Sequence, residues 1–118
     1  MSYDVNHQQS FSSPAAEVSH SALEILTRLG GKVSSKTNPA KGQLEADFNK
    51  KISEQMLNNR CQLRIKVTSQ SPESCQVMAK AYPIDPMGQK LAFGVQGNAA
   101  QVVIDTFFQE LTRQVSVA

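Results

Sequence analysis

The sequence predicts an α+β fold with two layers, in which two amphipathic helices pack on an antiparallel sheet of five to six strands. Three patterns predict this fold. Residues 14–29 and 98–115 repeat apolar side chains at helical spacing. Most of the chain between them alternates apolar and polar residues, as strands with one buried face do. The connections are short, which favours antiparallel neighbours.

The length and composition are those of a small globular protein. The chain has 118 residues, of which 40% are hydrophobic and 19% charged, so we expect residues 1–118 to form a single domain. A formal net charge of +2 is too balanced to favour nucleic acid as a partner. No apolar run reaches the ~20 residues of a membrane span, and the first residues do not resemble a secretory signal. We therefore predict a cytoplasmic location.

The first segment allows two interpretations. Residues 1–12 alternate weakly, so they form either an edge strand or a disordered arm. A helix over 14–29 follows, with Ser13 as the predicted N-cap. Glycine takes the left-handed conformation easily, so Gly30 is expected to end this helix.

A first hairpin is predicted after the helix. Residues 33–37 and 44–48 alternate on either side of turn residues. The expected pairing places Val33 opposite Phe48 on the inner face. On the outer face it places Lys36 opposite Glu45, a favourable cross-strand charge pair. Residues 50–59 break the alternation and are interpreted as a bridge or a short helical turn.

A second hairpin carries the clearest strand pattern. Residues 60–68 and 75–82 alternate strictly around a turn. With Val67 opposite either Cys75 or Val77, this pairing places Cys61 and Cys75 roughly 20–26 Å apart, at about 3.3 Å per residue. A disulfide needs Cα atoms within about 7 Å, so we predict two reduced core thiols. Residues 91–95 are predicted to form the last strand.

Residues typical of catalysis and metal binding are sparse. His20 lies between Glu17 and Glu24 on the first helix, which we interpret as a solvated charged face, because no metal-ligand spacing accompanies it. No nucleophile motif is present. We therefore predict no catalytic residue, no metal site and no cofactor, and enzymatic activity is the least favoured function.

One pair of carboxylates has a spacing that would suit acid–base chemistry. Glu45 and Asp47 share a strand face at a spacing of roughly 6.5–7 Å, which is close to the separation found in glycosidases. They are expected to oppose Lys36 and Ser34, respectively. We therefore interpret the pair as a neutralised sheet surface.

The outer face of the second hairpin has the most unusual composition. Basic side chains share it with a methionine and a tyrosine, beside the acidic residues of the first hairpin. Such a surface suits packing against a protein partner or a second copy. The interface candidates are Arg60, Arg64, Lys66, Met78, Lys80 and Tyr82.

Residues 11–18, FSSPAAEV, follow a possible strand and open a helix. This segment resembles the opening of START-like domains, the polyketide-cyclase or helix-grip type of ligand-binding domain, and the order of elements is also similar. The resemblance implies a groove between the concave face of the sheet and the last helix. The residues expected to line it are Phe48, Leu63, Ile65, Phe93, Ile104 and Phe107.

Two functions follow from these observations. The first is a small non-catalytic binding or assembly module that meets a protein partner, or itself as a homo-oligomer, through the exposed sheet face. The alternative is a carrier of a small hydrophobic molecule in the groove between sheet and helix.

Overall fold

A computed structural model describes residues 3–91, 95 and 97–115. The elements in chain order are β1 (Val5–Phe11), α1 (Ala15–Arg28), β2 (Lys32–Val33), the short 3-10 helix η1 (Pro39–Lys41), β3 (Gln43–Phe48), β4 (Lys51–Ile52), β5 (Gln55–Met56), β6 (Arg60–Ser71), β7 (Ser74–Ile84) and α2 (Ala99–Gln114).

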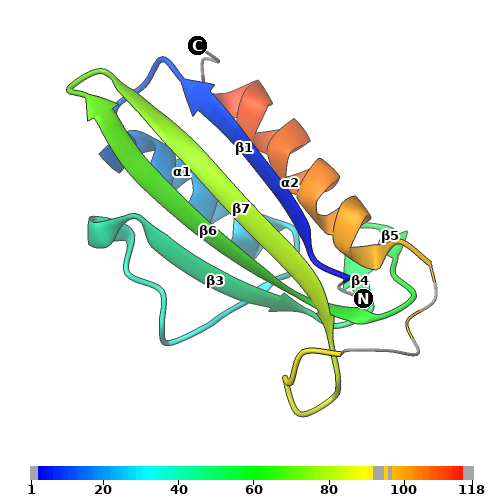
Figure 1. The fold of residues 1–118 in the computed structure, drawn as a ribbon. Coiled ribbons are helices and arrows are strands. Elements are labelled where there is room, and N and C mark those ends of the chain that lie inside the picture. Colours follow the sequence, from blue (N-terminus) through cyan, green and yellow to red (C-terminus); the bar gives the residue numbers. More distant parts are fainter. Residues whose placement is uncertain (1–2, 92–94, 96, 116–118) are drawn as a thin grey trace.

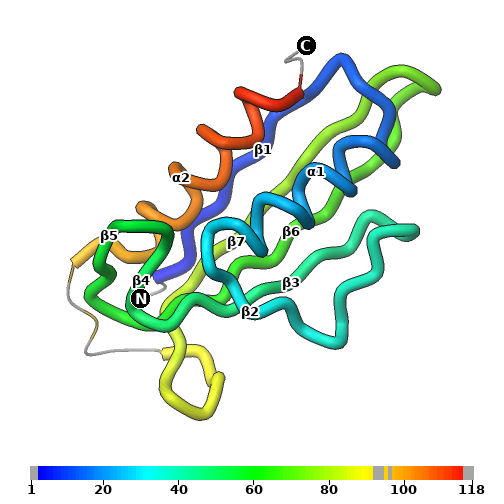
Figure 2. The backbone as a smooth tube through the Cα atoms, turned by 180° about the vertical axis from the view of Figure 1, so that it is seen from behind, coloured from blue at the N-terminus to red at the C-terminus, as the bar shows by residue number. Residues whose placement is uncertain are grey.

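The five main strands form one antiparallel sheet in the order β1-β7-β6-β3-β2. Both helices lie on the same face of this sheet (Figures 1 and 2). The α2 helix contacts β7, β6 and the edge strand β1, whereas α1 contacts β6, β3 and α2. The predicted α+β class and its two layers are therefore confirmed.

The core lies between the helices and the inner face of the sheet. Alternate residues of β6 and β7 point into it, and Leu63 and Val77 are fully buried. The helices contribute apolar stripes that include Ile25 and Phe107. These side chains belong to one continuous hydrophobic cluster. Hydrophobic burial therefore selects which face of each strand points inward.

The helix ends differ from the predicted caps. The α1 helix begins at Ala15, and its N-cap position is Pro14, with an extended ψ of 145°. Ser13 is thus one residue too early to be the N-cap, and its predicted capping role is wrong. At the other end the left-handed φ of 92° at Gly30 agrees with the predicted stop.

The first hairpin has a different register from the predicted one. Val33 lies opposite Ala46, not Phe48. After Val33 the chain leaves the sheet, and the Thr37 hydroxyl donates to the Glu45 carbonyl and accepts from the Glu45 amide. This side chain replaces the strand pairing that the prediction gave to Lys36, so the predicted cross-strand pair of Lys36 with Glu45 is wrong.

Gly42 explains how this connection closes. Its φ of 70° lies in the left-handed region, and its carbonyl accepts a hydrogen bond of 2.7 Å from the Val67 amide. A Cβ atom there would collide with the carbonyl oxygen of Val67. Both the conformation and the close approach require glycine.

Residues 50–59 form a small ribbon of two strands, β4 and β5, and not a helical turn. Lys50, just before β4, and Ser53, in the turn between β4 and β5, take positive φ angles of 56° and 54°, respectively. The last strand predicted over residues 91–95 falls mainly on residues 92–94, which lie outside the described residues, and Phe93 is among them.

The second hairpin has one of the two predicted registers, with Val67 opposite Val77. Cys61 lies opposite Pro83 and Cys75 opposite Ser69, at the two ends of the hairpin. Both cysteines are buried free thiols, which confirms that they do not pair with each other. Burial raises the pKa of Cys61 to about 12 and also raises the pKa of Cys75.

Candidate functional site

The residues predicted to line a groove lie in the core. The structure brings five of the six together between the sheet and the helices, each at most 3% exposed. The sixth lies outside the described residues. The five are Phe48, Leu63, Ile65, Ile104 and Phe107.

A hollow of about 210 Å³ opens where the start of α2 meets the start of β1 and the end of β7. Its lining is mainly apolar and includes the small side chains of two alanines at the start of α2, which leave room beside the strand. The residues that line it are Tyr3, Val5, Pro83, Val95, Gly97, Asn98, Ala99, Ala100 and Gln101.

A second hollow of about 260 Å³ lies farther along the same seam between β1 and α2. His7, on the inner face of β1, meets the ring of Phe108 edge-on, with 4.5 Å between the ring centroids. Ile104 also lines this hollow. The boundary between the edge strand and α2 is thus hollowed at two places.

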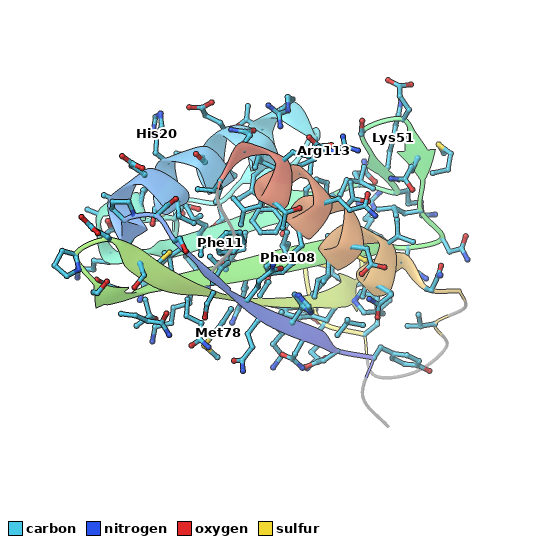
Figure 3. The ribbon with its side chains drawn as sticks, turned by 90° about the horizontal axis from the view of Figure 1, so that it is seen from above. Phe11, His20, Lys51, Met78, Phe108 and Arg113 are labelled. Atoms are coloured by element: carbon cyan, nitrogen blue, oxygen red, sulfur yellow. The ribbon has the colours of Figure 1, made fainter. Side chains whose placement is uncertain are left out.

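The opposite face of the sheet carries the predicted interface candidates. Cross-strand pairs place Lys66 opposite Met78 and Arg64 opposite Lys80. Figure 3 shows Met78 pointing away from the two helices. Arg60 lies opposite Ile84, at the beginning of β6.

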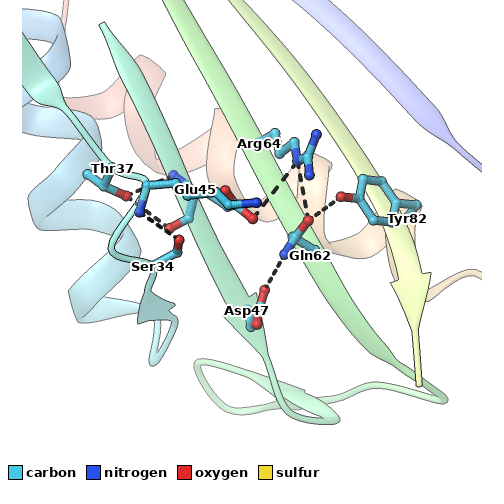
Figure 4. A network of polar contacts seen from close by, with 8 residues as sticks. Ser34, Thr37, Glu45, Asp47, Gln62, Arg64 and Tyr82 are labelled. Atoms are coloured by element: carbon cyan, nitrogen blue, oxygen red, sulfur yellow. Dashed lines mark hydrogen bonds and ion pairs between the residues drawn. The ribbon is translucent and has the colours of Figure 1, made fainter. Parts of the chain in front are cut away.

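A network of polar side chains lies at the Tyr82 end of this outer face (Figure 4). The Tyr82 hydroxyl donates to Oε1 of Gln62, which also accepts from Nε of Arg64 at 3.2 Å. Nε2 of Gln62 donates to Oδ1 of Asp47 at 3.0 Å. Tyr82 is 6% exposed and Gln62 is 9% exposed, so the centre of this network is buried although it lies on the outer face, whereas Arg64 is exposed.

Burial of this network changes the chemistry of Tyr82. It raises the pKa of the phenol, and the Arg64 guanidinium opposes this effect. The guanidinium carbon lies 5.7 Å from the centre of the Tyr82 ring, and Nζ of Lys90 lies 5.2 Å from it. The tyrosine is therefore a neutral hydrogen-bond donor with cations against its ring.

The paired carboxylates of this face are held by β6 and not by the partners that the sequence suggested. Glu45 lies opposite Arg64, with 3.9 Å between Oε1 and Nε, and Asp47 binds Gln62. The expected opposition to Lys36 and Ser34 is wrong, because Asp47 pairs with Lys32 and the Ser34 amide donates to the Glu45 carbonyl.

An open hollow of about 560 Å³ lies beside this network on the same face. Met78, 44% exposed, lies among polar and basic side chains there. Sequence reasoning identified four of its residues, Arg64, Lys66, Met78 and Lys80, but it missed the amides contributed by the first strand. The complete lining is Asn6, His7, Gln8, Arg64, Ile65, Lys66, Met78, Ala79 and Lys80.

The histidine of α1 makes a local ion pair, with 2.7 Å between Nε2 of His20 and Oε1 of Glu24, both exposed. Within residues 3–91, 95 and 97–115, no three histidine, cysteine or acidic side chains gather as metal ligands. Across the same part of the chain, no helix combines the length and the apolar character needed to cross a membrane.

Comparisons with known proteins identify the fold. Neither a protein-family model nor a curated protein matches the sequence. A START superfamily protein from Mycobacterium smegmatis is similar in structure, with a TM-score of 0.54 and 12% identity over 95% of this chain and 96% of that one. Ara h 8.0201 is also similar, with a TM-score of 0.52 and 6% identity over 94% of this chain and 95% of that one.

A third similar structure is the di-domain ARO/CYC BexL from the BE-7585A biosynthetic pathway. Its TM-score is 0.55 at 14% identity, and the match covers 92% of this chain. The match spans only 44% of BexL, so this chain corresponds to less than half of that protein. The resemblance in the order of elements is confirmed, and the fold of this chain is that of START-like proteins.

Proposed function

We propose that this chain binds a small, largely apolar molecule between its sheet and α2. The observation that carries the proposal is the apolar hollow at the start of α2, because residues of both the helix and the sheet line it. The START-like fold supports the proposal, since one of the similar structures is the di-domain ARO/CYC BexL of a biosynthetic pathway.

The size of the hollow limits the ligand. A volume of about 210 Å³ is below the ~300–1,000 Å³ typical of sites for drug-sized molecules. We therefore propose a ligand of a few carbon atoms, or a larger one that enters as the seam between β1 and α2 widens. The edge position of β1 favours such movement, because only one side of this strand is hydrogen-bonded within the sheet.

The five buried candidates remain the predicted lining of the deeper site. Small inner-face side chains lie among them, including Ala46, Ala79 and Ala81. A ligand that enters at Ala99 would continue along this row toward Phe107. Its contacts would be apolar, so we expect affinity to follow the hydrophobic surface of the ligand.

The test combines native mass spectrometry with titration of Nile red, an uncharged apolar dye. We expect a retained adduct or a saturable fluorescence increase. Ala99→Leu fills the hollow and should reduce dye affinity at least about threefold, whereas Ala16→Leu, at an exposed site of α1, should not. Equal dye affinity in both variants, with intact far-UV spectra, would overturn the proposal.

Binding of a protein partner or of a second copy through the outer sheet face stays a prediction, as does the cytoplasmic location. The acidic side chains that a self-complementary interface would use, Glu45 and Asp47, contact Arg64 and Gln62 of the same chain. If copies do associate there, Lys66→Glu with Lys80→Glu should lower the mass observed in sedimentation without unfolding the protein.

A further inference from the structure

We propose that the hollow on the outer face of the sheet binds a small anionic amphiphile, with a carboxylate or sulfate headgroup among the cations and an apolar chain over Met78. This site lies on the opposite face of the sheet from the helices and does not depend on the function proposed above.

The apolar half of the site is centred on Met78. This residue belongs to β7, an internal strand, and its outward neighbours are Gln8 of β1 and Lys66 of β6. Its side chain is 44% exposed in a hollow of about 560 Å³. Methionine is flexible and adapts to irregular apolar groups, so it is suited to contact an alkyl chain.

The cationic half of the site is formed by Arg64, Lys66 and Lys80, and no carboxylate lines the hollow within the described chain. Arg64 and Lys80 face each other directly across neighbouring strands. Like charges in that position repel each other. An anionic headgroup between them would lower this repulsion further than Asp4 and Glu45 do, which favours an anion over a neutral ligand.

The partners of these cations hold them at the rim. Nζ of Lys80 lies 3.0 Å from Oδ2 of Asp4, on the β1 side. Arg64 is held from the β3 side by Gln62 and Glu45. No ion pair or hydrogen bond of the Lys66 side chain is found within the described residues. Lys66, directly opposite Met78, is therefore available to a headgroup next to the apolar surface.

Two other occupants fit this face less well. A nucleic acid would need a wider basic surface than three cations in a chain with a net charge of +2. A second copy packed through the same face would have to present its acidic side chains to the hollow, but Glu45 and Asp47 are engaged by their own β6 strand. A small anion with one alkyl chain fits the combination of one exposed methionine and three cations best.

The experiment titrates octanoate, and octan-1-ol as its uncharged match, into isotopically labelled protein and follows the backbone amides by NMR. We expect octanoate to shift the amides around Lys66, Met78 and Lys80, and octanol to bind more weakly. The affinity for octanoate should fall as salt is added, because the cations are at the surface.

Variants separate the two halves of the site. Lys66→Gln and Lys80→Gln should each weaken octanoate binding about two- to fivefold, as expected for exposed charge pairs. Met78→Thr should weaken octanoate and octanol alike. Lys51→Gln, which removes an exposed charge on β4, is the matched control and should leave octanoate binding unchanged.

The outcomes distinguish this site from the one beside α2. Octanoate binding that survives Ala99→Leu but is weakened by Lys66→Gln supports the outer site. Shifts confined to β1 and α2, or equal affinities for octanoate and octanol, would overturn it. An octanoate-independent dimer that disappears in Met78→Thr would also overturn it, because a second copy would then occupy the face.

Discussion

The two faces of β6 and β7 are built from the same strands but are determined by different forces. Toward the helices, alternate residues from Cys61 to Val67 are at most 5% exposed, and hydrophobic burial decides their identity. On the outer face the exposure changes along the strand, because Gln62 and Tyr82 are buried whereas Lys66 and Met78 are open.

This difference follows from what covers the outer face. Segments 34–42 and 85–91 reach the Tyr82 end, where Lys36, Gly88 and Lys90 line a hollow with the polar network. Hydrogen bonds then replace the lost water for Gln62 and Tyr82. The Met78 end lacks such a cover among the described segments. An outer sheet face can thus hold a buried network and an open site side by side.

Leu63→Ala should give the largest difference between the faces. Leu63 is fully buried between Ala46 and Ala81 of the neighbouring strands, so truncation leaves a cavity that these small residues cannot fill. We expect a loss of about 2–5 kcal/mol in the free energy of unfolding, measured by urea denaturation. The exposed outer-face change Thr68→Ala should cost about 0.5 kcal/mol or less. Similar losses in both variants would contradict the comparison.

Alkaline pH should affect the inner face through Cys61. Burial raises the pKa of its thiol from 9.0 to about 12, so the folded state keeps the proton that the unfolded state loses. The stabilisation is complete below pH 9 and is lost as the pH rises toward 12. Each pKa unit corresponds to about 1.4 kcal/mol, so we expect a loss on the order of a few kcal/mol.

Urea denaturation at a series of pH values measures this loss. Cys61→Ala should have a shallower fall in stability above pH 9 than the parent protein, whatever its own stability at neutral pH. Met87→Ala, at a side chain 86% exposed, should keep the parent slope. Parallel curves for Cys61→Ala and the parent would show that the thiol does not carry the effect.

Tyr82→Phe tests the buried end of the outer face. The change removes the hydroxyl that donates to Gln62 and leaves that oxygen with Arg64 alone in the network. We expect a loss of about 1–2 kcal/mol by urea denaturation, since a buried hydrogen bond is broken. Tyr3→Phe is the matched control, because the Tyr3 hydroxyl makes no hydrogen bond within the described chain. Equal losses would mean that the network contributes no stability.

Sequence patterns predicted the structure correctly where one force dominated. Strict alternation predicted both faces of β6 and β7 and the separation of Cys61 from Cys75, because hydrophobic burial fixes the register there. The register of the first hairpin was wrong because the Thr37 hydroxyl binds the backbone of Glu45, which alternation does not encode.

The candidate sites were predictable only in part for the same reason. The side chains that gather on the outer face follow from strand alternation, and Lys66, Met78 and Lys80 were identified in this way. Their hollow depends on β1, whose place beside β7 brings Asn6 and Gln8 to the rim. The burial of Glu45 and Gln62 depends on segments that cross the sheet, and their course depends on tertiary contacts more than on local pattern.

Met78→Thr should have the smallest effect on stability and the clearest effect on binding. Threonine suits a strand, and the lost side chain is already 44% exposed, so we expect a change within about 0.5 kcal/mol by urea denaturation. The same variant should weaken octanoate binding, because the apolar surface beside Lys66 is gone. A loss comparable with that of Leu63→Ala would mean that Met78 is covered in solution. In that case the outer face would be a second buried surface, and the distinction between its two ends would fail.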